Sequence, residues 1–207
     1  MERRFVNAPV KLESRGEGQS PLINGYGAVF YDGTPGTEYE LWEDVSERIM
    51  PGAFDKCLSN DVRGLFNHDP NQILGRTASK TMRLNVDSKG LRYEIDADDT
   101  TCSRDVQRYL KRGDVDGSSF SFVVEDEAWI TQDKKQIREI RSVGILYDVG
   151  PVTFPAYTGT SAASRSAGDV ADARKSFEAR QAKEKQSLAA TLTAIATRAR
   201  LIEIEAA

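Results

Sequence analysis

Histidine and cysteine are scarce in this 207-residue sequence, which contains one histidine, His68, and two cysteines, Cys57 and Cys102. Two cysteines do not make the disulfide framework of a small secreted protein, so a reducing, intracellular setting is the simpler expectation. One imidazole and two thiols are also too few for the nitrogen and sulfur ligands of a usual zinc site. We therefore expect no bound metal ion.

The sequence also lacks a long hydrophobic run and an excess of positive charge. No window approaches the roughly 18 apolar residues of a membrane span, and the first residues, MERRFVNAPVKLESRG, lack the apolar core of a secretion signal. The formal net charge is −4 and the pI is about 5.2, whereas a nucleic-acid-binding domain usually carries a basic surplus or stripe. We expect neither a membrane nor a nucleic acid as a partner.

What the sequence does contain is a globular composition with many strand-like segments. Hydrophobic residues make up 39% of the chain and charged residues 29%, which is enough for a buried core. Apolar and polar residues alternate over 82–86 and 91–95 on either side of the turn Ser88-Lys89-Gly90, and this pattern predicts a β-hairpin. The expected fold class is mainly β (α+β). Further strands are predicted over residues 24–30, 118–124 and 143–154, and a second hairpin over 129–142.

Two short helices are predicted among these strands. Pro51 suits the first turn of a helix that would continue through Leu58. The segment Thr101–Arg112 has an apolar face, and Gly113 follows it as a terminator. Either Thr100 or Thr101 could cap the start of this second helix.

The composition changes after Tyr157. Residues 158–169 are small and polar, as in linkers, and the residues that follow are rich in Ala, Lys, Arg, Glu and Gln. We predict a domain over residues 1–160, a linker over 161–170 and a helical tail over 171–207. Apolar residues of the tail recur at spacings of four and three and form one stripe of a helix. Such a stripe needs to pack against another surface: the domain, a second tail or a partner's helix. The stripe consists of Leu188, Leu192, Ile195, Ala199 and Ile202.

His68 is a candidate general base, because imidazole is the side chain that ordinarily titrates closest to neutral pH. It lies in the turn Asn67-His68-Asp69-Pro70. Taken alone, a histidine there is more simply a surface residue bonded to its neighbours. Asp148 lies in a strongly apolar segment, where a carboxylate needs a partner. That partner could be the amides of a turn, or the ring N–H of His68 if Asp148 is the third member of a catalytic triad.

A candidate serine nucleophile lies in the segment Asp116-Gly117-Ser118-Ser119-Phe120-Ser121-Phe122. Serines in a strand after a glycine turn are usually structural. Alternation along a strand places Ser119 and Ser121 on one face, so the pattern alone does not choose between them. The same alternation predicts that Phe120 and Phe122 point together into a core.

In combination, these motifs resemble those of the prohead maturation proteases of tailed bacteriophages of the HK97 type. The resemblance covers about residues 24–165, and it implies a β-barrel flanked by short helices, similar to the herpesvirus assemblins. It is carried, in order, by Gly52-Ala53-Phe54, Asn67-His68-Asp69-Pro70, Leu74-Gly75-Arg76-Thr77, Arg112-Gly113-Asp114, Gly117-Ser118-Ser119-Phe120, Asp148-Val149 and Pro151-Val152-Thr153-Phe154-Pro155-Ala156-Tyr157.

The resemblance also implies roles for single residues. His68 would be the base, Ser119 rather than Ser121 the nucleophile, and Asp148 the third member. The sequence departs from the family pattern at two of these positions, since the third member is often glutamate and the position of Ser121 is often glycine. Arg76 could bind substrate or support the third carboxylate, although pairing with a surface acid is the simpler expectation.

The implied activity is that of a serine endopeptidase needing no cofactor. Its substrates would be the major capsid protein precursor with its scaffolding segment and the protease itself, inside the assembling prohead in the host cytoplasm. Self-association is left open, and a scaffold helix becomes the favoured cover for the tail stripe. The alternative is a catalytically silent assembly factor that uses the same fold to bind scaffold.

Overall fold

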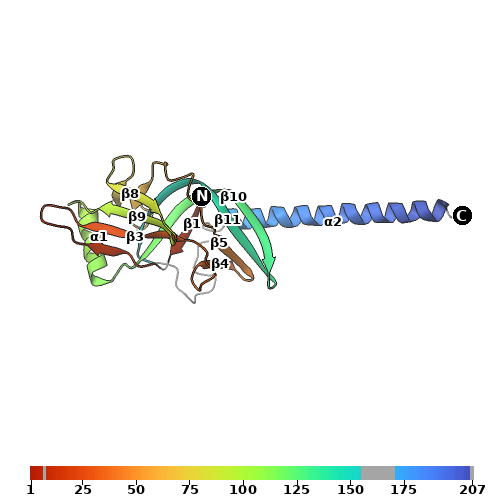
Figure 1. The fold of residues 1–207 in the computed structure, drawn as a ribbon, viewed down its shortest axis with the longest axis horizontal. Coiled ribbons are helices and arrows are strands. Elements are labelled where there is room, and N and C mark those ends of the chain that lie inside the picture. Colours follow the sequence, from red (N-terminus) through yellow and green to blue (C-terminus); the bar gives the residue numbers. More distant parts are fainter. Residues whose placement is uncertain (7, 155–170, 206–207) are drawn as a thin grey trace. The chain divides into compact units, whose positions relative to one another are not determined.

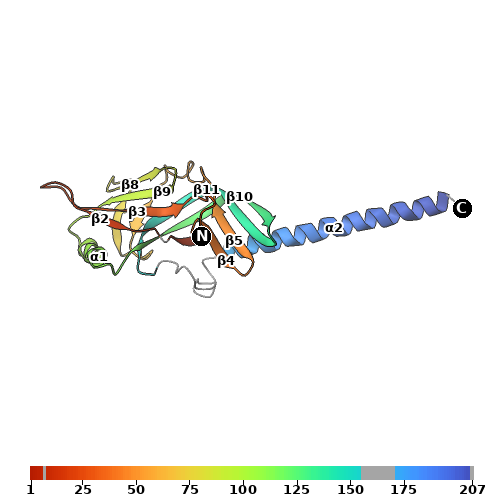
Figure 2. The ribbon, with the colours of Figure 1, turned by 60° about the horizontal axis from the view of Figure 1, so that its bottom comes forward.

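Strands dominate the computed structural model, which describes residues 1–6, 8–154 and 171–205 (Figures 1 and 2). The chain divides into two units, Met1–Val170 and Ala171–Ala207. The predicted linker and the last residues of the Pro151–Tyr157 motif lie outside the described residues.

The larger of two sheets is built on a long hairpin. Its strands are β10 (Gly117–Gln132) and β11 (Lys135–Val152), which pair antiparallel and run together as two bent strands in both views. β1 (Glu2–Val6) pairs with β10, while β5 (Val45–Ile49) and β6 (Arg63–Leu65) pair in parallel with two successive stretches of β11. β4 (Glu38–Trp42) and β7 (Ile73–Arg76) complete this sheet beside β5 and β6.

The smaller sheet is antiparallel and shares one core with the larger. Its strand order is β2 (Lys11–Glu13), β3 (Leu22–Val29), β9 (Gly90–Asp96) and β8 (Met82–Val86), so the hairpin predicted over 82–95 is confirmed. Phe120 and Phe122 are fully buried and stacked, with ring centroids 4.6 Å apart, as alternation predicted. Ile23, Leu91 and Ile95 of the smaller sheet belong to the same core.

The β-barrel implied by the resemblance is not confirmed. The strand pairings form two open sheets, and no closed ring of strands is found over the described ranges. The outer strands explain this, because β1 and β4 end the main path of the larger sheet, and β2 and β8 end the smaller one. Register shifts between Ser121 and Glu127 mark bulges in β10, which bend a sheet without closing it.

One of the two predicted short helices forms. α1 spans Thr101–Arg112; Thr100 is its N-cap, and Gly113 ends it at a φ of 78°, in the left-handed region that suits glycine. The helix predicted from Pro51 to Leu58 is wrong. Gly52 has a φ of 86°, and the segment forms successive turns in which the amides of Ala53, Asp55 and Cys57 each donate to the carbonyl three residues earlier.

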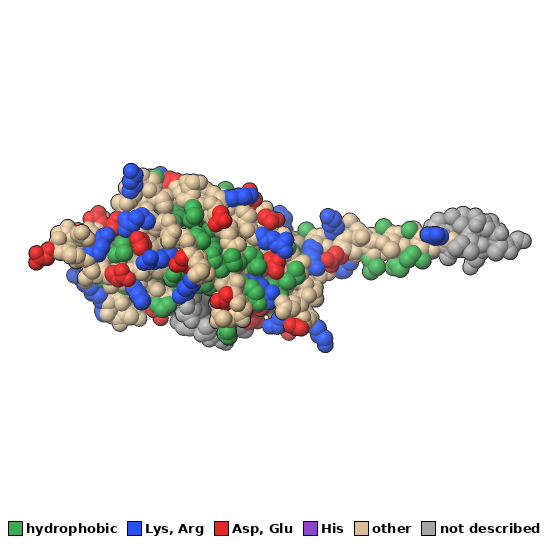
Figure 3. Space-filling model, viewed as in Figure 1, with side chains coloured by type: hydrophobic (Ala, Val, Ile, Leu, Met, Phe, Trp, Pro, Cys, Tyr) green, Lys and Arg blue, Asp and Glu red, His purple; other side chains and the backbone are tan. Residues whose placement is uncertain are grey.

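α2 spans Ala171–Glu205, which confirms a helix in the tail. Leu188, Leu192 and Ile195 of its predicted stripe are 62%, 57% and 61% exposed, and Figure 3 shows hydrophobic side chains gathered along one side of this helix. Across the part of the chain that is described, no helix is long and apolar enough to span a membrane.

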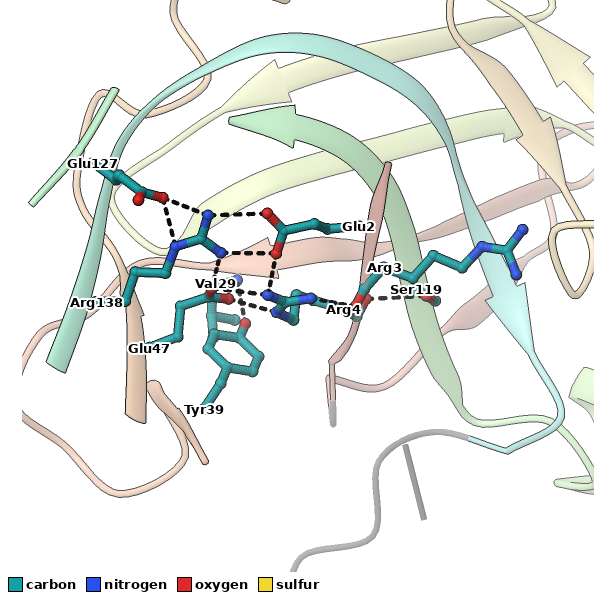
Figure 4. A network of polar contacts seen from close by, with 9 residues as sticks. All are labelled: Glu2, Arg3, Arg4, Val29, Tyr39, Glu47, Ser119, Glu127 and Arg138. Atoms are coloured by element: carbon teal, nitrogen blue, oxygen red, sulfur yellow. Dashed lines mark hydrogen bonds and ion pairs between the residues drawn. The ribbon is translucent and has the colours of Figure 1, made fainter. Parts of the chain in front are cut away.

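A cluster of buried charges joins β1, β5 and β11 of the larger sheet (Figure 4). Arg4 on β1 donates to Glu47 on β5 at 2.5 and 2.8 Å and to Glu2 at 2.5 Å. Arg138 on β11 donates to Glu2 at 2.7 and 2.9 Å and to Glu47 at 2.9 Å. A third carboxylate, Glu127 on β10, accepts from Arg138 at 2.6 Å. We call Glu2, Arg4, Glu47 and Arg138 the charge cluster.

The members of the charge cluster hold one another ionised. Burial alone would raise the pKa of Glu47, but the charges and hydrogen bonds of Arg4 and Arg138 lower it below its ordinary value. Burial opposes the charge of Arg138 too, yet its bonds and charge pairs to Glu2, Glu47 and Glu127 raise its pKa. Each charge therefore depends on partners from other strands, because an unpaired charge in this position is costly.

Arg138→Ala should destabilise the protein by about 3–5 kcal/mol, because it leaves the buried carboxylates of Glu2 and Glu47 with only Arg4 to neutralise both. The measurement is urea-induced unfolding followed by circular dichroism. Arg141→Ala, which removes an exposed arginine three residues along the same strand, is the matched control and should cost less than about 1 kcal/mol. Equal losses in the two variants would contradict the importance of the charge cluster.

Candidate active site

His68 lies in the loop of residues 66–72, which connects β6 to β7. Asn67 and His68 have φ values of 55° and 57°, a left-handed conformation that costs non-glycine residues about 1–3 kcal/mol and often marks functional sites. The Asn67 side chain holds this conformation by donating to Thr153 Oγ1 at 2.9 Å and accepting from the Thr153 amide at 2.8 Å. The loop is thereby tied to the end of β11.

Ser119, Ser121 and Asp148 come from the paired strands β10 and β11. In the antiparallel register Ser121 lies opposite Asp148, and Ser119 lies opposite Gly150. Ser118 faces the other way, into the core, where its hydroxyl is 2.9 Å from the Tyr93 hydroxyl. The alternation expected from the sequence therefore separates Ser118 from the other two serines.

The structure brings His68, Ser119 and Asp148 together in one chain of contacts. His68 Nε2 is 2.6 Å from Ser119 Oγ, and His68 Nδ1 is 2.5 Å from Asp148 Oδ1. With the proton on Nδ1, the ring donates to the carboxylate and accepts the serine proton at Nε2, the arrangement that activates a serine. Ser119 is fully buried, and the side chains of His68 and Asp148 are only 5% and 9% exposed.

The geometry distinguishes the two serines that the strand pattern left equivalent. Ser121 Oγ is 3.1 Å from His68 Nδ1, the nitrogen that also contacts Asp148. Nε2, the other ring nitrogen, contacts the hydroxyl of Ser119 instead. A general base that holds its carboxylate partner at Nδ1 takes a proton at Nε2. The position of Ser119 is therefore the one suited to a nucleophile.

β1 supplies a neighbour that sequence reasoning did not single out. The Ser119 hydroxyl is 3.0 Å from the Arg4 carbonyl, an acceptor that competes with His68 for its single proton (Figure 4). Phe5 pairs with Ser119 across the strands, and its ring lies edge-on to the imidazole at 6.4 Å. No periodic signal could have found this neighbour, because Glu2, Arg3 and Arg4 are charged residues in succession.

Arg76 lies apart from this chain of contacts. It is on β7, where it donates two hydrogen bonds to the exposed carboxylate of Asp61, at 2.8 and 2.5 Å. The hydrogen bond from Arg76 lowers the pKa of Asp61. Arg76 therefore pairs with a surface acid, which was the simpler of the expectations for it.

Gly150 lets β6, and with it the His68 loop, approach the two central strands. A Cβ atom at this position would lie 2.1 Å from the Leu65 carbonyl oxygen, closer than any real contact. Since Gly150 lies directly opposite Ser119, the lack of a side chain there allows the histidine loop to lie level with the serine.

No group of three or more His, Cys, Asp or Glu side chains that could hold a metal ion is found in the described parts of the chain.

The order serine, imidazole, carboxylate is that of the serine hydrolases. Residues 8–174 match the model of the caudovirus prohead serine protease family, and the chain belongs to this family. This membership confirms the resemblance and assigns the protein to the serine proteases of phage capsid maturation. A search of curated proteins and a search of solved structures each gave no match.

Gly150→Ala should lower proteolytic activity at least tenfold, because the added methyl group forces β6 and the His68 loop away from Ser119. Activity on a cleavable peptide is the measurement, with circular dichroism to confirm folding. Gly144→Ala is the control on the same strand, since a Cβ there would come no closer to any atom than 3.2 Å, the distance to the Glu125 Cβ. Normal activity in the Gly150 variant would show that this close approach does not set the site.

Proposed function

We propose that the protein is a serine endopeptidase in which Ser119 is the nucleophile, His68 the general base and Asp148 the third member of the triad. The observation that carries this proposal is the 2.6 Å contact of Ser119 Oγ with His68 Nε2 while Asp148 occupies Nδ1. Family membership supports it, because the family is one of serine proteases.

The chemistry follows from these contacts. Ser119 Oγ attacks the scissile carbonyl carbon as its proton passes to His68 Nε2, and the imidazolium then gives that proton to the leaving amine. Water hydrolyses the acyl-enzyme by the same route. Asp148 fixes the ring orientation and stabilises its positive charge. Since Ser119 has no exposed surface in this structure, a peptide can reach it only after a local rearrangement.

The substrates we propose are the major capsid protein precursor, with its scaffolding segment, and the protease's own chain between the domain and the tail. Cleavage would take place inside the assembling prohead in the host cytoplasm. The competing proposal is a catalytically silent assembly factor on the same fold. The close approach of His68 to Ser119 favours the enzyme, because binding scaffold requires no such contact.

We also propose that α2 carries the protease into the assembling shell by packing its apolar stripe against a scaffold helix. Leu188, Leu192 and Ile195 are more than half exposed and lie on one side of the helix. The match to the protease family ends at residue 174, in the first turn of α2, so most of the helix lies beyond the matched region.

Ser119→Ala should abolish cleavage of the co-expressed capsid precursor, by about 10⁴-fold or more, because no nucleophile remains. Mass spectrometry of the co-expressed proteins detects the products and locates the cut. Ser121→Ala is the matched control, since it removes a hydroxyl from the same strand face and should leave cleavage detectable. Continued processing by the Ser119 variant would favour the silent assembly factor.

A chain ending at Ser166 should still cut a short peptide but should be missing from purified proheads. The physical reason is that the truncation removes the apolar stripe and leaves the triad. Peptide cleavage and immunoblotting of proheads are the two measurements. A truncated chain that unfolds, or one that is packaged normally, would contradict the role of α2 in targeting.

A further inference from the structure

A cavity of about 360 Å³ opens beside the histidine loop. One wall is the loop itself, through Phe66, Asn67 and Asp69, and the other is α1, through Asp105 and Tyr109. Asn67 and Asp69 flank His68 in the sequence, and the Asn67 side chain is the one that ties the loop to Thr153. The cavity and the proposed base are therefore parts of one fixed structure.

Two carboxylates give this cavity a negative charge, and none of its lining residues is basic. Burial raises the pKa of the Cys102 thiol, which lies on the α1 wall, and the charges of Asp105 and Asp69 raise it further. The negative charges of both carboxylates are therefore felt at the same point of the cavity. Asp105 has a cationic neighbour in Arg108, whose exposed guanidinium lies 4.0 Å from the Asp105 carboxylate. Asp69 accepts instead from the amide and side chain of Asn71.

The rest of the lining suits a long cationic side chain. The rings of Phe66 and Tyr109, one from each wall, lie with centroids 6.1 Å apart and planes 31° apart, so aromatic surface lines both sides of the cavity. Aromatic rings pack against an alkyl stem and attract an ammonium or guanidinium group, while carboxylates pair with its charge. The two carboxylates, Asp69 and Asp105, can both contact the positively charged end of one lysine or arginine side chain.

We propose that this cavity is a substrate subsite that receives a lysine or arginine side chain close to the scissile bond, with Asp69 and Asp105 as its specificity residues. The proposal rests on the proposed function, and it adds the class of peptide that the enzyme selects. A peptide held by its basic side chain against the histidine loop would have its main chain fixed relative to His68.

The test is a mixed-sequence decapeptide library digested by the full-length protein, with products identified by mass spectrometry. Matched peptides with lysine or glutamine at the preferred position then give a ratio of kcat/KM values. We expect lysine to be favoured by about tenfold or more. Asp105→Asn and Asp69→Asn should each reduce the ratio at least threefold, and Asp105→Lys should shift preference toward glutamate. The ratio cancels any general loss of activity from a change beside His68.

Asp99→Asn is the control, because it removes the same charge from the exposed loop before α1 and does not line the cavity. Its lysine preference should match that of the wild type. Peptides cut without a basic preference, or a preference unchanged in both cavity variants, would overturn the subsite while leaving the protease intact. Failure of the wild type to cut any peptide or the capsid precursor would overturn the proposed function and the subsite together.

Discussion

The mutual neutralisation of four buried charges is the constraint on which the site depends. Glu2 and Arg4 come from β1, Glu47 from β5 and Arg138 from β11, and none of them can be buried cheaply without the others. The cluster therefore fixes β1 against the central hairpin in one register. In that register the Arg4 carbonyl meets the Ser119 hydroxyl, so the surroundings of the proposed nucleophile are set by charges on the other side of the strand.

Local patterns predicted the elements whose signals are local. The hairpin over 82–95 and the helix Thr101–Arg112 each carry their own alternation, caps and turns, and both form where expected. The segment after Pro51 failed because Gly52 takes a left-handed conformation that stops a helix before it begins. The strands predicted over 118–124 and 143–154 continue into the hairpin over 129–142, because bulges carry the pairing across residues that break the alternation.

The candidate site was foreseen as a set of residues, and its surroundings were not. The family resemblance named His68, Ser119 and Asp148. Strand alternation alone left Ser119 and Ser121 equivalent, and in the structure the position of the imidazole distinguishes them. Gly150 gave no signal of its own, since its role is to admit a carbonyl from residue 65. Contacts between residues so distant in sequence cannot be read from the periodicity of either segment.

The long sequence separation within the site has a consequence for its timing during translation. Ser119 lies 115 residues after Arg4, and Arg138 lies 136 residues after Glu2. At about 5–20 residues per second, the 115 residues between Arg4 and Ser119 take roughly 6–23 s to synthesise, and pairing over such distances is slow to nucleate. A nascent chain on the ribosome therefore lacks the proposed catalytic arrangement until β11 has emerged. Synthesis itself thus delays the appearance of the proposed catalytic arrangement in each new chain.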